Sequence, residues 1–192
     1  MAQTSTTILA AKSHKSDITG TDIRFNASSG VYTIATTTTS LSNLAINDLI
    51  TISGAGTSGN NSTFTVKEVA TDGFSITVHE VVITESAGQS ITIDHVGFVS
   101  SKFKGDGYFS KPDGMHTVSY KVSSTLTGSI KMQGSLATDP GNDDWFNIGD
   151  TQLDTDQSST MFSYNFTGNF VWVRAKASSI TAGTITSILL NS

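Results

Sequence analysis

The chain has 192 residues, 36% of them hydrophobic and 14% charged, with a formal net charge of −5 at pH 7. These values exclude a disordered polyelectrolyte, which would carry far more charge. Serine and threonine occur 28 and 29 times, whereas glutamate occurs three times. Because strong helix formers are scarce and residues suited to a pleated sheet are common, helical bundles, coiled coils and doubly wound α/β folds are excluded. The composition predicts an all-β protein.

Charge and cysteine content narrow the possible partners. The 11 basic residues are scattered along an acidic chain, so no basic stripe is available for a nucleic-acid backbone. Cysteine is absent, which excludes disulfides, thiolate zinc sites and a cysteine nucleophile. The first 16 residues lack the pattern of a signal peptide, and no apolar run is long enough for a membrane span. We expect neither a nucleic-acid nor a membrane partner.

Residues 1–20 are small and polar, and they are predicted to form a flexible N-terminal arm. Ordering each residue of such a segment costs about 1–2 kcal/mol, which its small apolar area cannot offset. A partner protein could offset that cost by strand addition, and a frayed terminus without a role is the alternative. The candidate contact residues are one apolar pair and one basic cluster: Ile8, Leu9, Lys12, His14 and Lys15.

Residues 21–95 contain short segments with alternating apolar residues, which are typical of half-buried strands. These segments lie at 31–34, 49–53, 63–69, 74–78 and 90–94. Clusters of Gly, Asn, Asp and Ser separate them, and Asp72-Gly73 between two of them is typical of a hairpin turn. The pattern predicts a small β-barrel or sandwich domain, with Phe64 in its core.

Residues 96–192 contain seven further strand candidates and most of the aromatic residues. The candidates lie at 101–109, 116–122, 128–136, 145–148, 161–166, 170–177 and 184–190. This number and spacing predict a jelly-roll-like β-sandwich domain with a thick core. Trp145, Tyr164 and Trp172 could form a platform for sugar stacking, but we favour a core position for Trp172.

Motifs for catalysis or metal binding are few. The densest acidic stretch contains Asp139, Asp143 and Asp144 and continues to Asp156, but it lacks the spacing of a calcium loop and a bidentate glutamate. We interpret it as a solvated loop that forms turns. The four histidines lie far apart, and no Gly-x-Ser-x-Gly turn is present. We therefore expect no catalytic residue, metal site or cofactor, and a glycosidase that uses Asp143 or Asp144 is the least favoured alternative.

Two sets of segments resemble proteins of tailed-bacteriophage virions. NDLITISG at 47–54, NNSTFTV at 60–66, FSITV at 74–78 and ESAGQSITI at 85–93 resemble a recurring small β-domain of these virions. GSIKMQGSL at 128–136, DWF at 144–146 and FTGNFVWVRA at 166–175 resemble a sandwich domain in structural proteins of phages that infect marine bacteria and cyanobacteria.

The resemblance implies a non-enzymatic virion protein that is made in the host bacterial cytoplasm and assembles with the major capsid protein or other virion proteins. Because the chain has no repeats or heptads, a long fibre is disfavoured. Two compact β-domains and an arm favour a capsid decoration (cement) protein that stabilises the outer head surface. Ile8, Leu9, Lys12, His14 and Lys15 would then be capsid contacts, strengthened by avidity in a homo-oligomer, which we take to be a trimer. The alternatives are a tail, baseplate, neck or head-fibre component, and a carbohydrate-binding module for receptor recognition.

Overall fold

The structure is a computed structural model that describes residues 5–109, 114–154 and 160–191. Within these residues the regular elements are β-strands and four short 3-10 turns, so the all-β prediction is confirmed. No helix in the described part of the chain is long and apolar enough to cross a membrane. The chain divides into two compact units, Lys15–Gly97 and a second unit that combines Met1–His14 with Phe98–Ser192.

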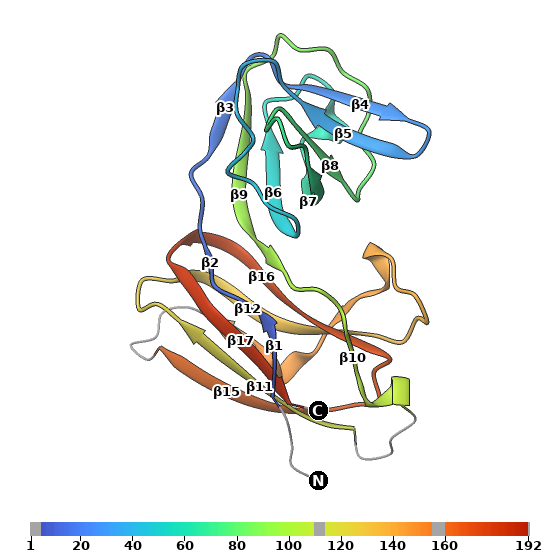
Figure 1. Cartoon of the computed structure of the whole chain (residues 1–192), viewed down its shortest axis with the longest axis vertical. Coiled ribbons are helices and arrows are strands. Elements are labelled where there is room, and N and C mark those ends of the chain that lie inside the picture. The colour runs from blue at the N-terminus through green and yellow to red at the C-terminus, as the bar shows by residue number, and fades with distance from the viewer. Residues whose placement is uncertain (1–4, 110–113, 155–159, 192) are drawn as a thin grey trace. The chain divides into compact units, whose positions relative to one another are not determined.

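The C-terminal unit is a sandwich of two antiparallel sheets (Figure 1). One sheet has the order β1-β17-β11-β15, with β2 also paired to β17. Its strands are β1 Thr6–Leu9, β2 Lys12–Ser13, β11 Met115–Val122, β15 Met161–Thr167 and β17 Thr184–Asn191. In the facing sheet β12 lies between β13 and β16, β10 pairs with β16, and β14 pairs with β12. Its strands are β10 Phe103–Lys104, β12 Thr127–Ser135, β13 Phe146–Asn147, β14 Leu153–Asp154 and β16 Trp172–Ala182.

The core of this unit follows from the alternation of side chains along its strands. In β16, Val173, Ala175 and Ala177 are buried between the sheets, while the residues between them face outward. Tyr120 of β11 is fully buried, and its hydroxyl donates a hydrogen bond to the carbonyl oxygen of Thr151 at 2.8 Å. This bond satisfies the polar group that burial of a tyrosine brings into the core.

Residues 5–20 do not form the predicted flexible arm, and residues 1–4 lie outside the described residues. β1 pairs antiparallel with β17, and Ile8 and Leu9 are 4% and 7% exposed. Burying two such side chains contributes about 1.5–3 kcal/mol each, and the strand hydrogen bonds add to this. Thr6–Leu9 is therefore held in place by β17, with which it shares a sheet.

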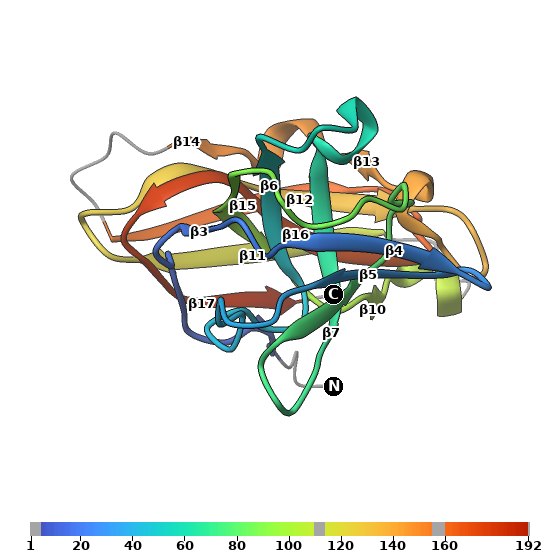
Figure 2. The ribbon, with the colours of Figure 1, turned by 90° about the horizontal axis from the view of Figure 1, so that it is seen from above.

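The N-terminal unit is an open antiparallel sheet in the strand order β9-β6-β7-β8-β5-β4, with β3 paired to β9. Its strands are β3 Ile18–Gly20, β4 Arg24–Ser28, β5 Val31–Ala35, β6 Asp48–Ser53, β7 Thr63–Val69, β8 Ser75–Val78 and β9 Ile91–Val99. Figure 2 shows β4 and β5 side by side as a hairpin. Residues 15–97 are all described, and in them β3 and β4 do not pair, so the barrel alternative is wrong.

Two local predictions for this unit are confirmed. The turn at Asp72-Gly73 joins the antiparallel strands β7 and β8, and Gly73 has a φ of 73°, which a residue with a side chain rarely adopts. Phe64 is 1% exposed and belongs to a separate apolar core with residues of β4, β5, β6 and β8. The chain then leaves the unit inside β9, whose end at Phe98–Val99 pairs with β16. The boundary predicted at 95–96 therefore falls within a strand and not in a loop.

Candidate functional site

The segment after β10 forms a tight turn against the backbone that precedes β16. The backbone amides of Gly105 and Gly107 donate hydrogen bonds to the carbonyl oxygens of Val171 and Phe170, both at 3.0 Å. A side chain at either glycine would collide with a backbone oxygen of Phe170 or Asn169. The strand predicted over 101–109 is therefore wrong beyond Lys104, because close backbone approach at two glycines replaces it by the 3-10 turn η2, Asp106–Phe109.

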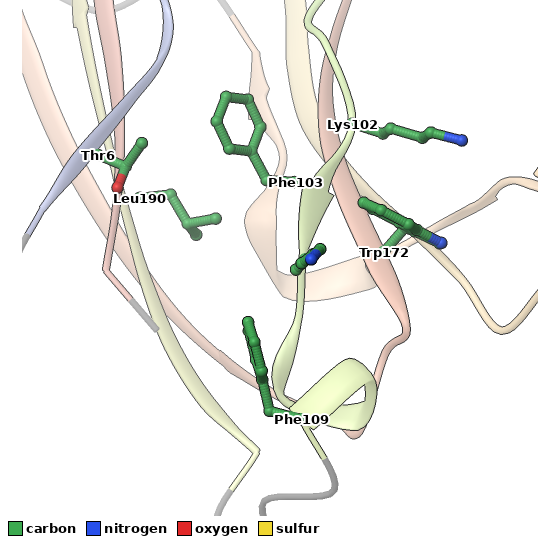
Figure 3. Close-up of a pocket in the computed structure, with 7 residues that line it drawn as sticks. Thr6, Lys102, Phe103, Phe109, Trp172 and Leu190 are labelled. Atoms are coloured by element: carbon green, nitrogen blue, oxygen red, sulfur yellow. The ribbon is translucent and has the colours of Figure 1, made fainter. Parts of the chain in front are cut away.

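A pocket of about 370 Å³ lies beside this turn in the C-terminal unit (Figure 3). Phe103 lies on β10, Phe109 rises from η2, and Thr6 and Leu190 approach from the facing sheet. The described residues that line it are Thr6, Lys102, Phe103, Lys104, Phe109, Trp172 and Leu190. The described lining thus includes two lysines and three aromatic residues, and Figure 3 shows Lys102 and Trp172 on the other side of β10 from Thr6, Leu190 and Phe109.

The two lysines lie against aromatic rings. Lys102 Nζ is 4.8 Å from the centroid of the Trp172 ring, and Lys104 Nζ is 4.0 Å from that of Tyr108. Tyr108 and Phe109 are 43% and 55% exposed, so each presents a large part of its ring at the surface. Because an exposed cation–π contact contributes only about 0.5–1 kcal/mol, these contacts orient the cations more than they stabilise the fold.

Trp172 is half-buried at the surface, so the prediction that it lies in the core is wrong. Its indole Nε1 donates a hydrogen bond to the carbonyl oxygen of Thr138 at 2.9 Å. Simple alternation would put Trp172 on the same face as Phe170, which is buried. β16 begins only at Trp172, and the alternation of faces does not extend back through the turn to Phe170.

A second pair of aromatic and cationic side chains lies on the outward face of β16. Arg174 is two residues after Trp172 and so faces the same side, and its guanidinium carbon is 4.1 Å from the centroid of the Trp145 ring. Arg174 Nε also donates a hydrogen bond to Gln133 Oε1 at 2.8 Å. Tyr164 lies in the other sheet, 5.6 Å from Tyr120 between ring centroids. Tyr164 therefore does not belong to a platform with the two tryptophans.

The acidic stretch has structural contacts. Asp139 accepts a hydrogen bond from Lys102 Nζ at 2.5 Å, and this bond, with the charge of Lys102, holds the pKa of Asp139 below its usual value. Asp144 Oδ2 accepts a hydrogen bond from the amide of Gly141 at 2.8 Å, as the prediction of a turn-forming loop implies. Asp156 lies outside the described residues. Within the described residues, no group of three or more His, Cys, Asp or Glu side chains could hold a metal ion.

The five residues predicted as contacts of an arm are dispersed over both units. Ile8 and Leu9 are core residues of the C-terminal unit. Lys12 Nζ lies 5.8 Å from the centroid of the Phe98 ring, and the His14 amide donates a hydrogen bond to the carbonyl oxygen of Gly183 at 3.1 Å. Lys15 belongs to the N-terminal unit. They do not form one exposed contact surface.

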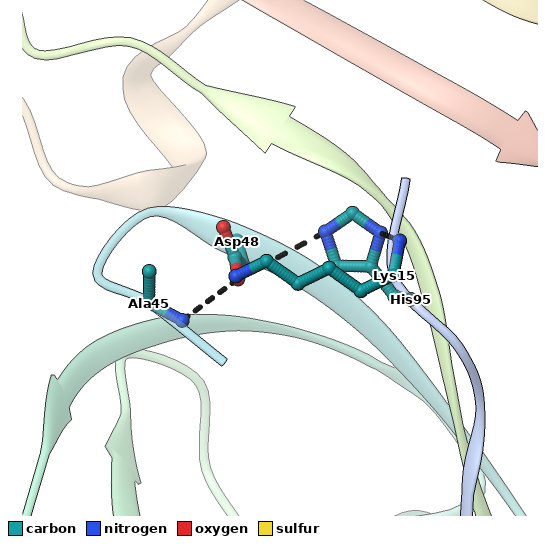
Figure 4. Close-up of polar contacts among 4 residues, drawn as sticks. All are labelled: Lys15, Ala45, Asp48 and His95. Carbon is teal, nitrogen blue, oxygen red and sulfur yellow. Dashed lines mark hydrogen bonds and ion pairs between the residues drawn. The ribbon is translucent and has the colours of Figure 1, made fainter. Parts of the chain in front are cut away.

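Lys15 belongs to a buried polar cluster within the N-terminal unit (Figure 4). The fully buried carboxylate of Asp48 accepts hydrogen bonds from Lys15 Nζ at 2.5 Å and from the Ala45 amide at 2.7 Å. His95 Nε2 lies 3.9 Å from the same carboxylate oxygen. Asp48 begins β6 and His95 lies in β9. The cluster therefore fixes Lys15, the first residue of the unit, against these two strands.

The sequence alone did not indicate the pocket. The strand predicted over 101–109 would put Lys102 and Lys104 on one face and would form no pocket. The pair Gly105 and Gly107 was the signal that a turn interrupts this segment.

Comparisons with known proteins give no family. No family model matches the sequence, and no curated protein matches it. Among solved structures, the K1 cleaved adhesin domain of Lys-gingipain from Porphyromonas gingivalis W83 aligns with 92% of this chain and 98% of its own. The TM-score is 0.33 and the sequence identity 6%, a likeness too weak to carry an inference.

Proposed function

We propose that this chain is a non-enzymatic structural protein of a tailed-phage virion and that it decorates the outer surface of the head. The similarity of segments such as 47–54 and 166–175 to virion β-domains carries this proposal. Its partner is then the major capsid protein, its location is the virion, and assembly as a homo-oligomer, a trimer in our proposal, multiplies weak contacts. A tail, baseplate, neck or head-fibre position is the alternative within the virion.

The contact with the capsid requires a surface other than the N-terminal segment, because Ile8 and Leu9 are buried. Val81 and Ile83 are 65% and 50% exposed, while Val82 between them is 1% exposed. This alternation directs two large apolar side chains to the same side of an extended segment. Exposed apolar groups on a well-held segment are typical of interaction surfaces.

Asn60 holds this segment in place. Its side-chain nitrogen donates a hydrogen bond to the carbonyl oxygen of Ile83 at 2.9 Å, and its side-chain oxygen accepts one from the Ile83 amide at 2.8 Å. Asn60 is itself fully buried. Because the segment is already fixed, Val81 and Ile83 would lose little conformational entropy on binding, which favours binding to a rigid partner.

Binding to undecorated heads tests the proposal. We expect the double variant Val81→Ser/Ile83→Ser to remain folded and to bind heads about thirtyfold more weakly, which corresponds to a loss of about 2 kcal/mol. The matched control is Val31→Ser/Ile46→Ser, which replaces two apolar side chains of the same unit that are 52% and 56% exposed. Cosedimentation with heads measures the affinity. Failure of the unchanged protein to bind heads contradicts decoration, and recovery of the protein in tail fractions favours the alternative position.

A second candidate function is a carbohydrate-binding module for receptor recognition. The exposed ring of Phe109 and the half-buried ring of Trp172, which both belong to the described lining of the pocket, favour it, because aromatic rings at a concave surface commonly bind the apolar faces of sugars. Binding to an array of purified glycans distinguishes this function from decoration, which requires no glycan affinity.

A further inference from the structure

We infer that the pocket between β10, η2 and β16 binds carboxylated sugars, with Lys104 binding the carboxylate and the aromatic rings contacting the sugar face. This inference deepens the second candidate function and depends on it, since it names the class of sugar that the module would recognise. It does not depend on the position of the protein in a virion.

The charge of the pocket is opposite to that of the chain. The protein carries a net charge of −5, yet the described residues that line the pocket include two lysines and no carboxylate. Asp139 already pairs with Lys102. Among the described residues no carboxylate lies within ion-pair distance of Lys104 Nζ, whose contacts are the rings of Tyr108 and Phe109 at 4.0 and 5.8 Å. Lys104 is therefore the cation available to an anionic ligand.

The walls of the pocket suit a flat ring that carries a charge. Its volume of about 370 Å³ lies within the range of about 300–1,000 Å³ typical of small-molecule sites. Phe109 offers apolar ring surface to the C–H face of a sugar, and the Thr6 hydroxyl on the same side of β10 can donate or accept a hydrogen bond. A carboxylated sugar combines an apolar face, hydroxyls and a negative charge within a few ångströms.

The rigidity of the pocket favours a sugar over an acidic peptide. The η2 turn is held by the backbone hydrogen bonds of Gly105 and Gly107, and Trp172 is held by its bond to Thr138. Fixed walls bind a rigid ring with little loss of ligand entropy, whereas an aspartate or glutamate side chain has no flat face to contact and must be immobilised. None of the described lining residues is an arginine, whose forked guanidinium is typical of phosphate sites.

Titration calorimetry with oligomers of galacturonate, and separately of mannuronate and guluronate, tests this inference. The matched probe is oligogalacturonate of the same length with every carboxylate methyl-esterified, which keeps the sugar ring and removes the charge. We expect the unchanged protein to bind at least one acidic oligomer, to bind the ester about tenfold more weakly, and to lose affinity as salt is added.

Three variants assign the binding to this pocket. Lys104→Gln and Phe109→Ala are each expected to weaken binding of the acidic oligomer about fivefold, since one removes the charge and the other the ring. Lys121→Gln removes an exposed cation of β11 outside the pocket and is expected to leave binding unchanged. Circular dichroism and thermal melting verify that the three variants remain folded.

Each contrary result has a distinct meaning. Equal affinity for the acidic oligomer and for its methyl ester overturns the inference, and the protein would then be a module that binds neutral sugars. Equally tight binding of poly-glutamate overturns it in favour of an acidic polypeptide. Equal losses in Lys104→Gln and Lys121→Gln overturn it by showing general charge attraction. Absence of binding to every acidic oligomer also overturns the inference. Decoration is tested separately, by cosedimentation of the protein with heads.

Discussion

Asp22 shows how single residues organise the polar surface of the N-terminal unit. Its carboxylate accepts hydrogen bonds from the backbone amides of Thr37, Thr38 and Thr39 at 2.8, 2.6 and 3.0 Å, and from the Thr39 hydroxyl at 2.5 Å. The Thr39 hydroxyl, followed by the three amides, holds the pKa of Asp22 well below its usual range. Three consecutive threonines, Thr37 to Thr39, therefore form a turn that binds the carboxylate of Asp22 and fixes the segment between β5 and β6.

This low pKa predicts a pH-dependent effect of Asp22→Asn. A carboxyl group with a depressed pKa in the folded state stabilises that state above its ordinary pKa and loses this effect progressively as the pH falls below about 4. We expect Asp22→Asn to lower the melting temperature at pH 7, and the difference from the unchanged protein to shrink below pH 4. Asp17→Asn, at an exposed position, is the control. A difference that is independent of pH would contradict this account.

At the scale of elements, the pairing of β1 with β17 joins the two ends of the chain in one sheet. The register places Thr6 opposite Leu190 and Thr7 opposite Leu189, with an irregularity before Leu9. β1 is also the edge of that sheet, so without it β17 would expose its backbone groups and the core beneath Ile8. The N-terminal strand is therefore part of the sandwich and not an addition to it.

Substitution of Ile8 tests the contribution of β1. We expect Ile8→Ala to reduce the free energy of unfolding by about 2–5 kcal/mol, because it leaves a cavity in the core. Thr7→Ala, at the exposed neighbouring position, is expected to change it by less than about 0.5 kcal/mol. Urea unfolding monitored by tryptophan fluorescence measures both values, since the two tryptophans lie in the C-terminal unit. Equal effects of the two substitutions would show that β1 is not packed in solution.

At the scale of the whole molecule, the chain has two separate apolar cores. One is formed by a single continuous segment and the other by two segments. One core lies within residues 15–97, whereas the other combines residues of β1 with residues from 98 to 190. A unit formed by one continuous segment can fold independently, but a unit formed by two segments requires both.

Fragments test this organisation. We expect a fragment of residues 15–97 to unfold cooperatively, with strand-dominated circular dichroism. A fragment of residues 98–192 lacks β1 and β2, and we expect it to be less stable and to regain stability when a peptide of residues 1–14 is added, by strand addition at β17. A scrambled peptide of the same composition is the control. Full stability of the fragment of residues 98–192 without peptide would contradict the role of the N-terminal strands.

The amino-acid sequence by itself determined the all-β class, most strand positions and the turn at Asp72-Gly73, because these depend on composition, on the alternation of neighbouring residues and on local turn geometry. The burial of Phe64 also followed from its place in an alternating segment. Only the tertiary structure decided the pairing of β1 with β17, the surface position of Trp172 and the pocket around Lys104. Each of these depends on contacts between segments far apart in the sequence, or on the close approach of two glycines to the backbone at Asn169 and Phe170. Alternation within a segment reveals that one face is buried, but the partner that covers that face is set by long-range packing.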